Sequence, residues 1–81
     1  MENYVIIYST HKKMIVHSTL KALLDKLPGQ QFVQTHKSYI VACNSVTATE
    51  GNTLHIGQHP IPISRQLKEQ VISRIINVRN S

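Results

Sequence analysis

The 81-residue chain has no tryptophan, a single cysteine and only four acidic residues. The lone Cys43 excludes an internal disulfide and any metal site built from cysteine alone. Aromatic residues are 5% of the chain and hydrophobic residues 41%, so Val, Ile and Leu must fill most of the core. This length and composition predict one small domain with one modest core.

Long apolar runs are also missing from the sequence. No stretch approaches the ~20 apolar residues that a membrane-spanning helix requires. The first residues, Met1, Glu2 and Asn3, carry neither the basic region nor the apolar stretch of a signal peptide. Together with the unpaired cysteine, these absences predict a cytoplasmic protein in a reducing compartment, without a membrane partner.

The shortage of acids leaves nine Lys and Arg against four Asp and Glu, a formal net charge of +5. Such a balance favours polyanionic partners, either nucleic acid or an anionic membrane face. Because many small domains are basic, charge alone does not decide between a nucleic-acid surface and an ordinary solvated one.

Groups for catalysis or metal binding are sparse. The acids are scattered with no spacing that suggests a carboxylate pair: Glu2, Asp25, Glu50 and Glu69. Cys43 follows a strand, where a small buried thiol is commoner than a nucleophile. The histidines form no HxxxH pair, although two that flank a hairpin turn could meet across it: His55 and His59. We therefore expect no enzyme, no metal and no cofactor.

The first half of the chain predicts a hairpin followed by a helix. Residues 4–8 and 14–17 are typical of strands and flank a basic turn at residues 9–13. Ser18 and Thr19 offer a helix cap, and Pro28 with Gly29 ends the helix. Its leucines recur at i, i+3, i+4 and i+7 and predict a core-facing stripe: Leu20, Leu23, Leu24 and Leu27.

The second half predicts short strands and a final helix. Residues 32–33 and 38–41 form one strand, or two that meet at Thr35 and His36. Residues 46–49, 53–56 and 59–63 follow as strands, and two prolines make the last one an edge. Ser64 caps a helix whose apolar face is Leu67, Val71, Ile72, Ile75 and Ile76. Without β-helix-β alternation, we expect antiparallel pairing.

Standard nucleic-acid-binding modules do not fit this order of elements. Strands separate the two helices, which excludes a helix-turn-helix. An RNA-recognition sheet needs exposed aromatic residues on adjacent strands, whereas Phe32 and Tyr39 lie in apolar, core-like surroundings. Polar and basic groups instead occupy turns and junctions, where Lys, Arg and Asn can read bases if they reach the major groove: Asn3, Lys12, Lys13, His36, Lys37, Ser64, Arg65 and Gln66. For Lys12 and Lys13, a solvated turn is an equally good interpretation.

Three motifs in order and spacing resemble one known family. They are LKALLDKLP (residues 20–28), FVQTHKSYIV (residues 32–41) and IPISR (residues 61–65), preceded by ENYV at residues 2–5. Together they resemble the LytTR family, the DNA-binding output domain of LytR/AlgR-type bacterial response regulators. The resemblance covers nearly the whole chain, and it implies a two-component transcription regulator.

The resemblance implies a mostly β fold with two short helices, an elongated stack of short antiparallel sheets. It implies binding to double-stranded promoter DNA with direct repeats, with loops in successive major grooves and a dimer on the DNA. The implied base-contacting positions are Asn3 or Tyr4, Lys37 and Arg65. The implied phosphate or supporting contacts are Gln34, His36, Ser38, Gln66 and Lys68, to which the basic turn adds Lys12 and Lys13.

The chain departs from the family pattern at three places. Gln34 stands where the family often has Arg, and Ala42 stands where it usually has Asn, a contact that Asn44 could supply. Residues 1–81 are then a single domain without the family's first apolar strand, and an upstream receiver domain is expected. An alternative function is a protein-interaction module, with the edge from Pro60 to Ile63 accepting a partner strand.

Overall fold

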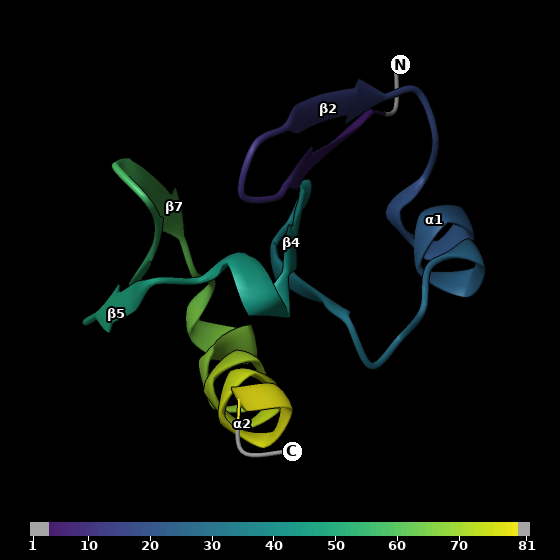
Figure 1. Cartoon of the computed structure of the whole chain (residues 1–81). Helices are drawn as coiled ribbons and strands as arrows, with labels where there is room; N and C mark the ends of the chain where they lie inside the picture. Colours follow the sequence, from purple (N-terminus) through teal and green to yellow (C-terminus); the bar gives the residue numbers. More distant parts are fainter. Residues whose placement is uncertain (1–3, 80–81) are drawn as a thin grey trace.

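The computed structural model describes residues 4–79, which form two sheets and two α-helices (Figure 1). The strands and helices follow the order β1 (Val5–Tyr8), β2 (Lys13–Val16), α1 (Leu20–Lys26), β3 (Phe32–His36), β4 (Tyr39–Ala42), β5 (Ala48–Glu50), β6 (Thr53–Ile56), β7 (His59–Pro62) and α2 (Lys68–Arg79). Short 3-10 turns cover Cys43–Ser45 and Arg65–Leu67. The prediction of a mostly β fold with two helices is confirmed.

The larger sheet has the strand order β2-β1-β4-β3. Its two hairpins are antiparallel, as predicted, but the central pair β1 and β4 is parallel, with Ile6 opposite Tyr39. The parallel pair was not predicted. It follows from α1, which carries the chain across between β2 and β3, so that β4 runs in the direction of β1. The short helix thus acts as a crossover connection.

The smaller sheet is an antiparallel meander in the order β5-β6-β7. Its turns contain Gly51 and Gly57 at φ of 59° and 62°, a left-handed conformation that favours glycine. β5 begins at Ala48, two residues later than the predicted strand. The prediction that the strand carrying Pro60 and Pro62 is an edge is confirmed.

Residues 35–41 form a hairpin rather than one continuous strand. The turn lies at Lys37 and Ser38, and β3 continues through Thr35 and His36, where the sequence suggested that two strands would meet. Thr35 is fully buried, which holds β3 in the core up to its last residues. A bulge between Gln34 and His36 adjusts the register before the turn.

Each face of the larger sheet contributes to a core. On one face Leu23 of α1 packs against Val5, Ile7 and Ile40, and the predicted leucine stripe flanks this small core. On the other face the meander and α2 enclose the larger core, in which the most deeply buried aliphatic side chains are Val41, Leu54, Ile61 and Val71. The domain therefore has two cores rather than one.

The N-terminal ends of α1 and α2 differ in their capping. Thr19 caps α1 as predicted, and its Oγ1 accepts a hydrogen bond from the Ala22 N–H at 3.1 Å. The predicted Ser64 cap is wrong, because the Ser64 side chain makes no capping hydrogen bond and a 3-10 turn leads into α2. Ile76, predicted on the core face of α2, is 50% exposed.

The principal extents of the molecule are 36 × 27 × 24 Å. Within residues 4–79 no helix is long and apolar enough to span a membrane.

Candidate nucleic-acid interface

Two backbone hydrogen bonds bring three distant segments together at one end of the larger sheet. The Ile6 N–H donates to the Ser38 carbonyl at 2.8 Å, which joins the start of β1 to the β3–β4 turn. The Ser64 N–H donates to the Thr35 carbonyl at 2.7 Å, which joins the segment before α2 to β3. The three predicted base-reading regions are therefore neighbours in space.

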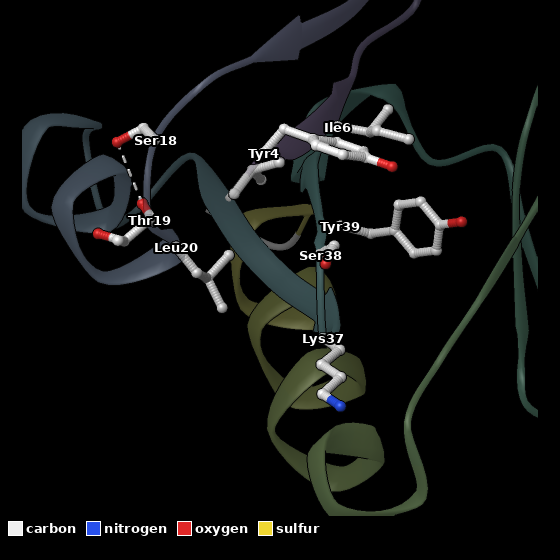
Figure 2. Close-up of a pocket in the computed structure, with 9 residues that line it drawn as sticks. Tyr4, Ile6, Ser18, Thr19, Leu20, Lys37, Ser38 and Tyr39 are labelled. Atoms are coloured by element: carbon white, nitrogen blue, oxygen red, sulfur yellow. Dashed lines mark hydrogen bonds between the residues drawn. The ribbon is translucent and has the colours of Figure 1, made fainter. Parts of the chain in front are cut away.

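A pocket of about 500 Å³ lies between the first two of these segments (Figure 2). Tyr4, Lys37 and Ser38 line it on the strand side, and residues 18–20 line it on the side of α1. Tyr4 is 48% exposed, and Lys37 is exposed at the turn. In Figure 2 the Lys37 side chain extends away from both Tyr4 and α1.

A second pocket, of about 340 Å³, lies between the turn and the segment before α2. It is lined by Gln34, His36, Lys37, Ser64, Gln66 and Leu67. The Gln34 side-chain amide donates to the His36 carbonyl at 3.1 Å, which braces the strand just before the turn. Lys37 borders both pockets and therefore occupies the middle of this surface.

We call this surface the loop face. It comprises Tyr4, Gln34, His36, Lys37, Ser38, Ser64, Arg65 and Gln66. Arg65 is exposed between Ser64 and Gln66, and Lys68 is exposed at the first position of α2. The predicted contact Asn3 lies outside the described residues.

Lys12 and Lys13 lie apart from the loop face. They belong to the β1–β2 turn, which is closed by a hydrogen bond from the Ser9 N–H to the Lys12 carbonyl at 2.8 Å. This turn adjoins Tyr8, whereas the loop face adjoins Tyr4, at the opposite end of the strand. At 3.3 Å per residue, these ends are separated by about 13 Å. His11 and His59 line the pocket of about 230 Å³ beside the turn.

The segments that form the loop face contain no acidic residue. No Asp or Glu occurs between residues 26 and 49 or between residues 51 and 68. Of the described acids, Glu50 lies 3.7 Å from the His55 Nε2, within the smaller sheet. The positive charges of Lys37 and Arg65, which have no acidic neighbour in their own segments, therefore suit a polyanion.

The candidates for other chemistry are placed elsewhere. His55 lies opposite Pro60 and not opposite His59, so the two histidines do not pair across the sheet. Among residues 4–79 there is no group of three His, Cys, Asp or Glu that could hold a metal ion. Cys43 is fully buried. Burial raises the pKa of its thiol, against smaller opposing effects of Arg74 and a backbone hydrogen bond. A thiol with a raised pKa is a poor nucleophile.

The β7 edge offers little to a partner strand. Ile61 and Ile63 are buried in the larger core, and the Ile63 N–H already donates to the Asn52 carbonyl at 2.7 Å. Pro60 and Pro62 are the exposed residues, and neither has an N–H to donate. These contacts weigh against the protein-interaction alternative.

Two features were missed in the sequence. Arg74 of α2 donates to the carbonyls of Gly29 and Phe32 and so anchors the α1–β3 loop. Tyr39, assigned to core-like surroundings, is half-buried, and its ring lies 5.9 Å from that of Tyr8 on the neighbouring strand. The alternation of Tyr4, Ile6 and Tyr8 could have indicated an aromatic face on this sheet, because alternate side chains of a strand share one face.

In the comparison with protein-family models, residues 1–75 match the LytTr DNA-binding domain. The chain belongs to the LytTR family, as its motifs suggested. The comparisons with curated proteins and with solved structures gave no match.

Proposed function

We propose that the loop face binds double-stranded DNA sequence-specifically by placing its loops in the major groove. The observation that carries this proposal is the pair of backbone hydrogen bonds, Ile6 to Ser38 and Ser64 to Thr35, which hold together the segments that carry Tyr4, Lys37 and Arg65. Preorganised segments lose less conformational entropy on binding than free loops do. The absence of acids between residues 26 and 49 further supports a phosphate-rich partner.

The base-contacting residues in this proposal are Lys37, Arg65 and Tyr4, with Asn3 before it. Lys37 stands at the tip of a tight turn and can donate to guanine O6 and N7, and Arg65 can do so with two parallel hydrogen bonds. Phosphate and supporting contacts come from Gln34, His36, Ser38, Gln66 and Lys68. Lys12 and Lys13, at the far end of β1, contribute a sequence-independent attraction to phosphates.

The biological setting is part of the same proposal. Residues 1–81 form a single domain, and they act as the output domain of a cytoplasmic bacterial response regulator. An upstream receiver domain completes the two-component protein. Two copies bind direct repeats in promoter DNA, one copy to each repeat.

Selection of bound sequences from random duplex DNA, followed by a footprint, tests the proposal. We expect a repeated motif whose copies are about one helical turn apart. Binding to the selected duplex should weaken steeply with salt, because each neutralised phosphate contributes about −0.9 to the slope of log K against log salt. An unenriched pool, or no duplex binding at low salt, would refute base reading and favour a protein partner.

A further inference from the structure

One face of the larger sheet carries an aromatic strip that duplex reading does not use. Tyr4, Ile6 and Tyr8 alternate along β1 and therefore point to the face opposite α1. Figure 2 shows Tyr4, Ile6 and Tyr39 on that side. The chain contains three tyrosines, so all of them belong to this face.

A chain of ring contacts crosses all four strands on this face. The Lys13 Nζ of β2 lies 5.9 Å from the centroid of the Tyr8 ring of β1. The Tyr8 ring lies 5.9 Å from the Tyr39 ring of β4, and the Tyr39 ring lies 5.6 Å from the His36 imidazole of β3. We call these four side chains the aromatic ladder.

The ladder is partly exposed, although Tyr8 also packs against the larger core, and its surroundings are basic. Tyr8, Tyr39 and His36 are half-buried, and Lys13 is exposed. β1, β2, β3 and β4 contain no Asp or Glu. The Lys12–Lys13 turn adjoins the Tyr8 end of the ladder, and Lys37 borders a pocket that Tyr39 also lines.

We propose that the aromatic ladder is a stacking platform for the unpaired bases of single-stranded nucleic acid. Aromatic side chains on adjacent strands of a four-stranded sheet stack about two or three bases, and nearby lysines track the phosphates. The strands lie about 4.8 Å apart, so the ladder spans roughly 14 Å, which suits that number of bases. Positive charge along its length favours a polyanion over a protein partner.

This activity is independent of duplex reading by the loop face. Bases in a duplex are stacked on one another and cannot lie on a tyrosine ring, so the ladder recognises only strands that are already unpaired. His36 belongs to both surfaces. Variants at Tyr8 and Tyr39 can therefore separate the two activities.

Tyrosine fluorescence provides a direct test because the chain has no tryptophan. Titration of the full chain with oligothymidine should quench this fluorescence saturably, and added salt should weaken the binding. Tyr39→Leu should weaken binding roughly 5- to 100-fold, whereas Tyr39→Phe, which retains the ring, should bind like the original protein. Lys13→Gln, at an exposed position, should also weaken it and keeps the test available if Tyr39→Leu does not fold.

Met14→Ala is the matched control. Met14 lies on β2 opposite Ile7, on the α1 side of the sheet, and is 47% exposed. Unchanged fluorescence with oligothymidine, or equal losses from Met14→Ala and Tyr39→Leu, would overturn the proposal. A different result would also overturn the proposal: the protein forms a dimer that Tyr39→Leu abolishes, and it does not bind oligothymidine. That result would assign the face to contact with a second copy of the chain. The affinity of Tyr39→Leu for the selected duplex should stay within about twofold of that of the original protein. This result distinguishes failure of the ladder from failure of the loop face.

Discussion

Substitution of Thr35 tests whether its buried hydroxyl, in the core beneath the loop face, lacks a hydrogen-bond partner. The residue is fully buried in β3, and its Oγ1 has no hydrogen-bond partner among residues 4–79. A buried hydroxyl without a partner costs about 1–3 kcal/mol of desolvation. Valine has nearly the same shape and the same β-branching, so Thr35→Val should stabilise the fold by about 1–2 kcal/mol. The backbone hydrogen bond from Ser64 is unchanged by this substitution.

Thermal and urea unfolding followed by circular dichroism measure the effect. For a domain of this size, 1 kcal/mol raises Tm by roughly 4–8 °C. Thr47→Val is the control, because the Thr47 Oγ1 donates to the His55 carbonyl at 2.9 Å and accepts from the Gly57 N–H at 3.2 Å. We expect Thr47→Val to lower the free energy of unfolding by about 0.5–1.5 kcal/mol. A loss of 1 kcal/mol or more in Thr35→Val would mean that its hydroxyl is hydrogen-bonded in solution, and the reasoning would fail.

Three further predictions concern stability. Thr19→Ala removes the α1 cap and should cost about 0.5–2 kcal/mol in urea unfolding; an unchanged midpoint would contradict the observed capping bond. Gly51→Ala should cost about 1–2 kcal/mol because φ is positive there, whereas Gly29→Ala, with open space and no positive φ, should not; similar effects at both would exclude this cause. Burial raises the pKa of both Cys43 and Tyr8, the latter also through Tyr39, so both hold their protons more tightly when folded. The free energy of unfolding should therefore be highest below their ordinary pKa values and fall as pH rises through and above them. The fall should be smaller in Cys43→Ala. A free energy of unfolding by urea that does not change at alkaline pH would contradict this.

Local patterns predicted most of the elements, because each depends on neighbours in sequence. The leucine spacing predicted α1. The parallel β1–β4 pair could not be read from local periodicity, because it depends on how α1 crosses between the hairpins. The turn at Lys37 was misplaced by two residues because polar Thr35, which resembles a loop residue, is buried in β3.

The candidate site was predictable in its residues but not in its geometry. The family resemblance supplied Tyr4, Lys37 and Arg65, whereas charge alone ranked them no higher than Lys12. Their proximity depends on the parallel pairing and on the hydrogen bond from Ser64 to β3, both of which join distant parts of the chain. The aromatic ladder was missed for the same reason, since Tyr8 and Tyr39 become neighbours only through that pairing.

The specificity ratio of single-lysine and single-arginine variants tests the loop face most directly. It is the affinity for a selected duplex divided by the affinity for a random duplex of equal length and salt. We predict that Lys37→Ala and Arg65→Ala each lose about 1–3 kcal/mol on the selected duplex and lower the ratio, whereas Lys12→Ala weakens both duplexes alike and preserves it. Lys21→Ala, at an exposed position on α1, is the control. Equal losses from Lys37→Ala, Arg65→Ala and Lys12→Ala on random DNA, with the ratio unchanged, would contradict base reading by the loop face.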